Sequence, residues 1–307
     1  MKVAVLGCGA MGSIYAGLLS SSGHEVMAID RNKAHIDAIN AQGLRVFGAS
    51  GDRTVSIQAY ADLPDAEVDL LIVALKAAHV PAVAEATRLL NSDGVVLTIQ
   101  NGLGSSETVA DAFGPERVIV GVAQGFGASV PEPGHSHHND MKAIRMGAYA
   151  GGDGARLNEV VGAFKDAGFD TESVDDIARI QWEKLICNAA YSGPCALTGM
   201  TVGEMLDDPV MSPVSRAAAT EAWETAKGLG VAIDVDDPVA YVKEFAERMR
   251  AAKPSVLLDL EAGRRSEIGV LNGAVDREAK KIGRAAPVNA TITALVLSME
   301  ERMESQA

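Results

Sequence analysis

The first 30 residues constrain the fold more than any other part of the chain. A short apolar, β-branched run from Lys2 to Leu6 leads into the glycine-rich segment Gly7-Cys8-Gly9-Ala10-Met11-Gly12, and small residues follow to about Ser22. This order predicts a strand, a tight turn and a helix, with a second strand from Glu25 to Asp30. Such a unit begins a doubly wound α/β fold with a parallel sheet.

The spacing of the glycines also predicts a ligand. Gly7 permits the tight turn, Gly9 lets the backbone approach a pyrophosphate, and Gly12 lets the helix lie close to the strand. The N-terminus of that helix attracts the anion, so Ala10 and Met11 are expected to bind the cofactor with the glycines. A nicotinamide dinucleotide is the predicted ligand, and a glycine turn without a ligand is the alternative.

Two residues at the end of the second strand bear on which dinucleotide binds. Asp30 would accept hydrogen bonds from the adenosine ribose and repel a 2′-phosphate, which favours NAD. Arg31 could instead pair with that phosphate, which favours NADP. Either residue could also be a plain surface charge, so the choice stays open.

Strands and helices alternate to about residue 175, and the chain then becomes helical almost to its end. This change of period predicts a Rossmann-type dinucleotide-binding domain over residues 1–175 and an all-helical substrate domain over 176–307. The expected strands are Leu44 to Phe47, Val55 to Tyr60, Val68 to Leu75, Val95 to Ile99, Val118 to Val122, Gln124 to Val130, Ala143 to Gly147 and Phe169 to Val174; the expected helices are Ala78 to Leu90, Ser105 to Phe113 and Ala155 to Ala167.

Composition limits the partners. The net charge of −14 argues against a nucleic-acid-binding surface. Cys8, Cys187 and Cys195 fit neither a disulfide framework nor a zinc site, which favours a reducing cytosol. The N-terminus lacks a basic leader, and no apolar run reaches the ~18 residues that a membrane span needs. We therefore expect a cytoplasmic protein that binds neither membranes nor nucleic acids.

Ligands of open parallel sheets lie beyond the carboxyl ends of the strands. Lys76 closes one buried strand, and Gln100-Asn101-Gly102 follows the next. Lys76 and Asn101 are expected to face the nicotinamide half of the dinucleotide. The alternatives are a solvated charge at Lys76 and a turn that needs a positive φ angle at Asn101-Gly102.

The run from Ile180 to Ser192 contains neither glycine nor proline and is expected to be helical. Lys184, Asn188 and Ser192 would then stack on one face, because residues four apart are neighbours on a helix. Apolar residues surround this stripe. Lys184 is either placed for chemistry or solvated beside Glu183.

His135, His137 and His138 lie close together, but no carboxylate or cysteine at a known ligand spacing accompanies them. Pro131 and Pro133 mark the segment as a connecting loop between strands. The sequence therefore predicts no metal site here.

Taken together, these positions resemble the ketopantoate reductase (2-dehydropantoate 2-reductase) family over nearly the whole chain. The resemblance implies a Rossmann domain joined to an all-helical domain, and NADPH-dependent reduction of ketopantoate to (R)-pantoate on the route to pantothenate and coenzyme A. The matching pieces are Gly7-x-Gly9-x-x-Gly12, the strand ending in Lys76, Gln100-Asn101-Gly102, the Pro133-Gly134 hairpin with a following histidine, Trp182-x-Lys184-x-x-x-Asn188, Pro254-Ser255 with Asp259, Ser266-Glu267-Ile268, Asn272-Gly273 and Ala286-Pro287-Val288-Asn289.

The resemblance also implies roles for individual residues. Lys184 would be the general acid, and hydride addition to a ketone needs such a group because negative charge builds on the oxygen. Glu267 would complete the polar network around it. The remaining implied contacts are Asn101 and Lys76 with nicotinamide and substrate, Asn188 with a substrate hydroxyl, and Ser255 with the substrate carboxylate.

Ser255 and Glu267 can share a small ligand only if the helix between them breaks, because one continuous helix would hold them ~18 Å apart. Gly263 is a natural stop, and Ser266 is a natural N-cap for a new helix with Glu267 in its first turn. Capping alone is the alternative role for Ser266 and Glu267.

Two departures from the family pattern leave the substrate and cofactor open. Ser192 stands where the family typically carries a second asparagine, and Asp30 opposes NADP. An NAD-dependent dehydrogenase of another branched or aromatic 2-hydroxy acid is the alternative. A dinucleotide-sensing protein without catalysis is more remote, because it has no need of the polar residues around Lys184. Apolar stripes on the later helices could bury the core or the second copy of a homodimer.

Overall fold

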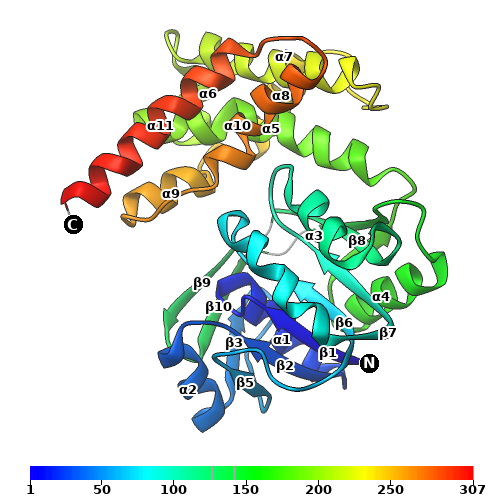
Figure 1. Ribbon diagram of the computed structural model, residues 1–307. Coiled ribbons are helices and arrows are strands. Elements are labelled where there is room, and N and C mark those ends of the chain that lie inside the picture. The colour runs from blue at the N-terminus through cyan, green and yellow to red at the C-terminus, as the bar shows by residue number, and fades with distance from the viewer. Residues whose placement is uncertain (126, 141–142, 307) are drawn as a thin grey trace. The chain divides into compact units, whose positions relative to one another are not determined.

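The computed structural model describes residues 1–125, 127–140 and 143–306, and the chain divides into two compact units. Unit 1 comprises Met1–Gln100 and Ser105–Ile177, and unit 2 comprises Asn101–Gly104 and Ala178–Ala307 (Figure 1). The four residues from Asn101 to Gly104 therefore leave the first unit and belong to the second. The predicted division into 1–175 and 176–307 does not include this excursion.

Unit 1 is built around an eight-stranded sheet with the strand order β12-β11-β8-β7-β6-β1-β2-β5. Every pairing is parallel except that between β11 and β8. Strand β1 lies between β2 and β6, so the chain extends the sheet first on one side of β1 and then on the other, as in a doubly wound sheet. The strands are β1 (Lys2–Leu6), β2 (Glu25–Ile29), β5 (Gln58–Tyr60), β6 (Val68–Val73), β7 (Leu90–Thr98), β8 (Val118–Gln124), β11 (Ala143–Ala148) and β12 (Asp170–Ser173).

Helices and apolar strands enclose the core of this unit. Tyr15 of α1 packs against Phe164 of α4 and against Phe169, with ring centroids 6.0 and 5.8 Å away. This aromatic cluster joins α1 and α4. The helical segments are α1 (Ala10–Ser21), α2 (Lys33–Gln42), α3 (Ser105–Phe113), α4 (Gly154–Asp166) and the 3₁₀ segments η1 (Ala77–Leu89) and η2 (Pro115–Arg117).

A second sheet of four strands packs on α1. Its strand order is β4-β3-β10-β9, with β10 parallel to β3 and antiparallel to β9. A Cβ atom at Gly17 of α1 would lie 2.4 Å from the Val46 side chain, so glycine allows this close approach. The strands are β3 (Leu44–Gly48), β4 (Arg53–Val55), β9 (Gly127–Glu132) and β10 (His135–Asp140).

This second sheet corrects two predictions. The expected strand Val55 to Tyr60 is two strands, β4 and β5, which belong to different sheets. The histidine segment is the strand β10, not a connecting loop, because β3 and β9 supply partners for its backbone. The predicted hairpin at Gly134 is confirmed as the turn between β9 and β10, with a φ angle of +79°.

The predicted helix Ala78 to Leu90 is also corrected, since this segment is the 3₁₀ helix η1. Pro81 lies inside it and has no N–H to donate. The preceding strand β6 ends at Val73, so Lys76 lies beyond the strand at the start of η1.

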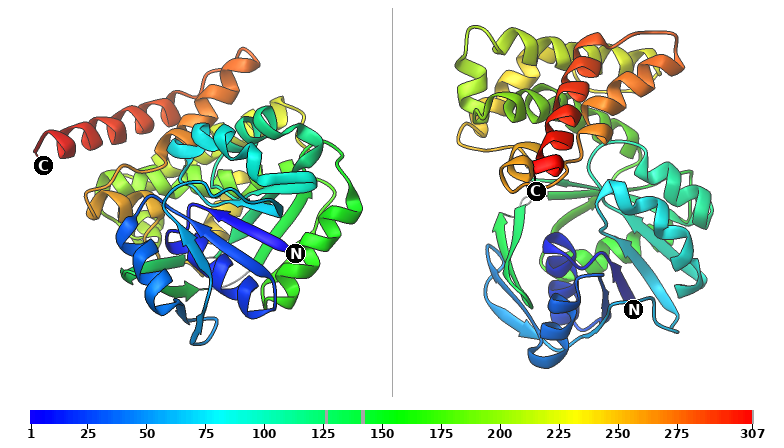
Figure 2. Two further views of the ribbon diagram at one scale, coloured as in Figure 1. Left: turned by 60° about the horizontal axis from the view of Figure 1, so that its bottom comes forward. Right: turned by 60° about the vertical axis from the view of Figure 1, so that its left-hand side comes forward.

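Unit 2 is helical, as the sequence predicts. Its core contains a hydrogen-bonded asparagine pair: fully buried Asn272 donates to the Ala189 carbonyl and to Asn289 Oδ1, both at 2.9 Å. Asn289 in turn donates to the Ala218 carbonyl, so this pair links α5, α7, α10 and α11. Figure 2 shows α11 as a long final helix. The helices are α5 (Ile177–Thr198), α6 (Val202–Asp207), α7 (Ser212–Gly228), α8 (Pro238–Arg248), α9 (Ser255–Glu261), η3 (Ile268–Val270), α10 (Asn272–Lys281) and α11 (Pro287–Gln306).

The three cysteines are buried and form no disulfide. Across the described ranges, no helix has both the length and the apolar character needed to cross a membrane.

Candidate active site

The glycine turn between β1 and α1 has one open side. Gly7 has a φ angle of +91°, and a Cβ atom there would lie 2.7 Å from the Leu75 amide nitrogen. A Cβ atom at Gly12 would lie 2.2 Å from the Gly7 carbonyl oxygen. A Cβ atom at Gly9 would have no heavy atom within 4 Å. The first and third glycines are thus needed for packing, whereas the middle one leaves room for a ligand.

Gly9 is also the N-cap of α1, and its lack of a side chain leaves no side-chain hydrogen bond at this cap. The N–H groups of the first turn, which includes Ala10 and Met11, can therefore be offered to an anion. These features fit the pyrophosphate of a dinucleotide.

Asp30 and Arg31 differ in how firmly they are held. Asp30 follows β2 and is partly buried, and its Oδ1 accepts a hydrogen bond from the Asn32 amide at 2.8 Å. Arg31 is exposed. The carboxylate is therefore held in place by a local turn, whereas the guanidinium projects into solvent.

The segment Asn101–Gly104 is anchored in unit 2. The Leu103 amide donates to the Val270 carbonyl at 3.0 Å, and the Leu103 carbonyl accepts from Arg277 Nη2 at 3.0 Å. Gly102 has a φ angle of +75°, and a Cβ atom there would lie 1.9 Å from the Val270 carbonyl oxygen. The turn with a positive φ angle, which the sequence offers as the alternative role of Asn101-Gly102, is present, and no side chain fits at Gly102.

The residue before this segment is held in unit 1. Gln100 Nε2 donates to the carbonyl oxygens of Val73 and Leu75, at 2.6 and 3.1 Å. Gln100 thus fixes the backbone just beyond β6, where the exposed Lys76 follows. The chain therefore has fixed anchor points on both sides of the peptide bond that joins Gln100 to Asn101.

Lys184 and Asn101 are brought together within unit 2. Lys184 Nζ donates to Asn101 Oδ1 at 2.7 Å. Burial lowers the pKa of Lys184 to about 8, and the negative charge of Glu267 acts against this shift. The ammonium is therefore held by the Asn101 amide oxygen and attracted by the Glu267 carboxylate, in surroundings that favour giving up a proton.

The helix that carries Lys184 places a polar stripe on one face. Helix α5 is continuous from Ile177 to Thr198, so the predicted alignment of Lys184, Asn188 and Ser192 is confirmed. Asn188 is partly buried, and Ser192 is buried. Trp182, Leu185, Ile186, Ala189 and Ala190 are buried around the stripe.

The predicted break between Ser255 and Glu267 is confirmed. Helix α9 ends at Glu261, and Gly263 follows with a φ angle of +65°. The prediction of Glu267 in the first turn of a new helix is wrong, because it precedes the short 3₁₀ turn η3. Ser255 is exposed at the first residue of α9.

Ser266 has a structural partner that the sequence pattern does not reveal. Its amide and its hydroxyl both donate to Glu300 Oε1, at 2.8 and 2.6 Å. The hydroxyl also accepts from the Ile268 amide at 3.3 Å. Ser266 therefore fastens the segment before Glu267 to helix α11.

Comparison with known proteins identifies the family. Residues 3–151 match the family described as "Ketopantoate reductase PanE/ApbA", and residues 176–300 match its C-terminal counterpart. The 2-dehydropantoate 2-reductase of Pyrococcus horikoshii is 30% identical over 98% of this chain and 98% of its own. The chain belongs to the ketopantoate reductase family.

Solved structures agree with this assignment. The PanE/ApbA family ketopantoate reductase from Ralstonia eutropha JMP134 has a TM-score of 0.89 at 31% identity and covers 99% of this chain and 100% of its own. A D-mandelate dehydrogenase solved with NADH and anilino(oxo)acetate has a TM-score of 0.91 at 24% identity, with 99% of each chain covered, and shares the fold. The predicted family, the α/β fold and the activity as an oxidoreductase of the ketopantoate reductase type are confirmed.

The family motifs divide into two groups in this ketopantoate reductase. One group supplies the glycine turn in unit 1 and, separately, the Lys184–Asn101 pair in unit 2. The other is structural: Asn272 and Asn289 bond to each other and to backbone carbonyls in the core of unit 2. Arg277 and Val270, which anchor the Asn101 segment, had no sequence signal, because only the tertiary structure pairs them with Leu103.

The histidines of β10 have local partners. His135 Nδ1 lies 2.5 Å from Glu132, His137 Nδ1 lies 2.6 Å from Asn139, and His138 Nδ1 lies 3.0 Å from Ser50. Within residues 1–125, 127–140 and 143–306, no group of three or more histidine, cysteine or carboxylate side chains could hold a metal ion.

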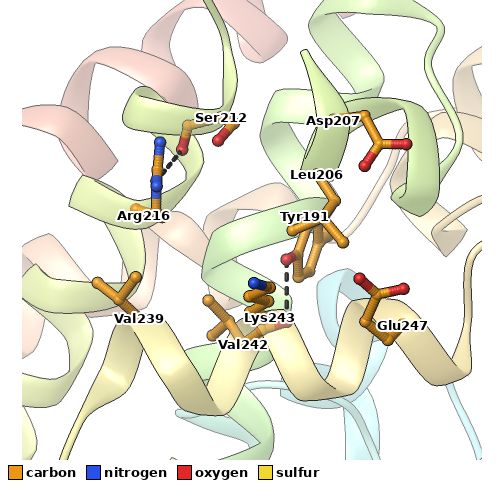
Figure 3. Close-up of a pocket in the computed structure, with 9 residues that line it drawn as sticks. All are labelled: Tyr191, Leu206, Asp207, Ser212, Arg216, Val239, Val242, Lys243 and Glu247. Carbon is orange, nitrogen blue, oxygen red and sulfur yellow. Dashed lines mark hydrogen bonds between the residues drawn. The ribbon is translucent and has the colours of Figure 1, made fainter. Parts of the chain in front are cut away.

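A hollow of about 280 Å³ lies elsewhere in unit 2 and contains none of the predicted site residues (Figure 3). Its two carboxylates, Asp207 and Glu247, both pair with Arg250. The lining residues are Tyr191, Leu206, Asp207, Ser212, Arg216, Val239, Val242, Lys243 and Glu247.

Proposed function

We propose that this chain reduces ketopantoate to (R)-pantoate, with Lys184 as the general acid. The observation that carries this assignment is the Lys184 ammonium held at 2.7 Å by Asn101, with a pKa lowered to about 8 by burial. We assign dinucleotide binding to unit 1 and substrate binding to unit 2. The open side of the glycine turn supports the first assignment, and the polar stripe of α5 supports the second.

A bound reduced nicotinamide supplies the hydride that adds to the carbonyl carbon. As the carbonyl oxygen gains negative charge, the Lys184 ammonium stabilises it and then transfers a proton to it. The oxygen becomes a hydroxyl, and Lys184 is left as a neutral amine that regains a proton from water. A pKa near 8 suits this role, because the group is mostly charged at neutral pH and still gives up its proton readily.

Asn101 and Glu267 act on Lys184 in different ways. Asn101 accepts one of its N–H bonds and so fixes the direction of the side chain. Glu267 raises the pKa of Lys184 against the effect of burial, so it keeps the ammonium charged. We infer that Asn101 also contacts the substrate or nicotinamide, together with Lys76.

The remaining substrate contacts are assigned by their chemistry. Asn188 lies one helical turn beyond Lys184 and would bind the substrate hydroxyl, with Ser192 one turn further. Ser255, an exposed hydroxyl, would bind the carboxylate. Because serine has a shorter side chain and fewer hydrogen-bonding groups than asparagine, Ser192 leaves another branched or aromatic 2-oxo acid as the alternative substrate.

The family resemblance favours NADP(H) as the cofactor. NAD(H) is the alternative, because the Asp30 carboxylate is held by the Asn32 amide at the end of β2 and would repel a 2′-phosphate. Arg31 is exposed and could pair with that phosphate. The proposed cofactor-binding residues are those of the glycine turn and of the end of β2: Gly7, Gly9, Ala10, Met11, Gly12, Asp30 and Arg31.

A steady-state assay tests the proposal. Purified protein is mixed with NADPH or NADH and a panel of 2-oxo acids, and loss of the reduced nicotinamide is followed. We expect the highest kcat/KM with ketopantoate. A ketopantoate rate equal to the no-enzyme control with both cofactors would refute the substrate assignment. Dinucleotide binding without turnover of any acid would favour the non-catalytic alternative. The cytoplasmic location and the homodimer stay predictions.

A further inference from the structure

A buried chain of hydrogen bonds lies behind the glycine turn. His35, on helix α2, is only 2% exposed, and its Nε2 lies 3.1 Å from the Ser13 hydroxyl. Ser13, on α1, donates to the Cys8 carbonyl oxygen at 3.2 Å. On the other side of the ring, the Gly134 amide donates to His35 Nδ1 at 3.0 Å. These contacts connect the β9–β10 hairpin to the glycine turn through one imidazole.

The Gly134 amide fixes the direction of both hydrogen bonds of His35. The Gly134 amide can only donate, so His35 Nδ1 must be the acceptor and Nε2 must carry the proton. Nε2 therefore donates to the Ser13 hydroxyl, whose own hydrogen is directed to the Cys8 carbonyl. The imidazole has to be neutral for this arrangement, because a protonated ring has no acceptor.

The surroundings of His35 favour the neutral ring. Burial lowers the pKa of His35, although the Asp30 carboxylate at the end of β2 opposes this shift. The Cys8 thiol lies 3.6 Å from the Ser13 hydroxyl, and burial raises its pKa to about 12, so it is uncharged at neutral pH. The neutral ring that this chain of hydrogen bonds requires is therefore favoured at neutral pH.

The Cys8 carbonyl determines where the next amide points. Cys8 C=O and Gly9 N–H belong to one trans peptide plane and point in opposite directions. Because Ser13 holds the carbonyl on its own side, the Gly9 N–H is directed away from Ser13. Gly9 is the glycine whose missing side chain leaves open space.

We propose that His35 is a positioning residue for dinucleotide binding: acting through Ser13, it fixes the Cys8–Gly9 peptide so that the Gly9 N–H is presented to the phosphates. This inference rests on the proposed binding of a dinucleotide at the glycine turn. It also gives the second sheet a role, because the sheet's hairpin supplies the amide that fixes the imidazole.

The hairpin is itself held against both helices. Gly134 has a φ angle of +79°, and a Cβ atom there would lie 3.1 Å from Ala38 Cβ of α2. Ser136 of β10 donates to the Ala10 carbonyl oxygen of α1 at 2.9 Å. The donor to His35 Nδ1 is therefore fixed relative to the helix that begins at the glycine turn.

Two substitutions at His35 separate its two hydrogen bonds. In His35→Gln the amide nitrogen can replace Nε2 as donor to Ser13, whereas the bond from Gly134 is lost. In His35→Asn the amide oxygen can replace Nδ1 as acceptor from Gly134, whereas the donor to Ser13 is lost. Each variant loses one buried hydrogen bond of the same ring, so both are expected to lower Tm by similar amounts.

The measurement is Kd for NADPH and NADH by titration calorimetry, with Tm measured alongside. We expect His35→Asn and Ser13→Ala to weaken dinucleotide binding by about tenfold, the size of one buried hydrogen bond. His35→Gln should stay within about twofold of wild type. In turnover assays, the loss should raise KM for the cofactor and leave kcat unchanged. Ile39→Val, a buried change on the same helix, controls for general loosening of α2.

The outcomes distinguish the two levels of the proposal. If the wild-type protein binds neither dinucleotide, the proposed function fails. If it binds, but Ser13→Ala and His35→Asn bind as tightly as wild type, the positioning role of His35 is refuted. If His35→Asn, His35→Gln and Ile39→Val all weaken dinucleotide binding in proportion to their loss of Tm, His35 has only a structural role, and the positioning role is likewise refuted.

Discussion

Raising the pH from 7 to 9 should slow ketone reduction by nearly tenfold, because Lys184 loses its proton in this range. Burial lowers the pKa of Lys184 to about 8. The protonated fraction of such a group falls from about 0.9 at pH 7 to about 0.1 at pH 9. A lysine with the ordinary pKa of 10.5 would stay almost fully charged over the same range.

The contribution of Lys184 to stability should change in the opposite direction, whereas the buried thiols Cys8, Cys187 and Cys195, whose pKa values burial raises, act against it, so unfolding is monitored separately at each pH. The Lys184 pKa is lower in the folded chain than in the unfolded chain. Between about 8 and 10.5 the unfolded chain therefore binds more protons at this residue, and this contribution to the free energy of unfolding rises with pH.

The assay records initial rates of nicotinamide oxidation at saturating ketopantoate across this pH range, with Tm at each pH. Glu267→Gln removes the charge that raises the Lys184 pKa, so its inflection should move to lower pH. Lys184→Arg keeps a permanent positive charge and should give a low rate without the inflection. A wild-type rate that stays constant to pH 9, or an unchanged inflection in Glu267→Gln, would refute Lys184 as the acid.

Three further substitutions test the site. Gly9→Ala should leave Tm unchanged and weaken dinucleotide binding, since a Cβ atom there meets no protein atom within 4 Å; a lower Tm with normal binding would contradict this. Gly102→Ala should lower the free energy of unfolding by more than about 3 kcal/mol, because its Cβ atom would clash with Val270 and its φ angle would be strained. The control Gly263→Ala has only the strained φ angle. Similar Tm values for the two variants would contradict the anchoring of the Asn101–Gly104 segment. Ser192→Asn should raise kcat/KM for ketopantoate relative to other 2-oxo acids, and an unchanged preference in the substrate panel would remove Ser192 from substrate selection.

Several features follow from local sequence patterns. The three glycines after β1 have the conformation and space that their spacing predicts, because a strand-turn-helix unit is specified over only a few residues. The face shared by Lys184 and Asn188 follows from helical periodicity alone. The break at Gly263 follows from the preference of glycine for a positive φ angle at helix ends.

Other features depend on partners that are distant in the sequence, and only the tertiary structure determines them. Val55 to Tyr60 reads as one strand, because β-propensity does not say which neighbour each half will pair with. Asn101 meets Lys184 because Val270 and Arg277 hold the intervening segment, and His35 meets Ser13 because a hairpin 99 residues away fills the other side of its ring. The sequence by itself thus determined the family, the dinucleotide turn and the candidate acid. The tertiary structure decided which residues hold them in place, because such contacts depend on packing between segments that no local periodicity records.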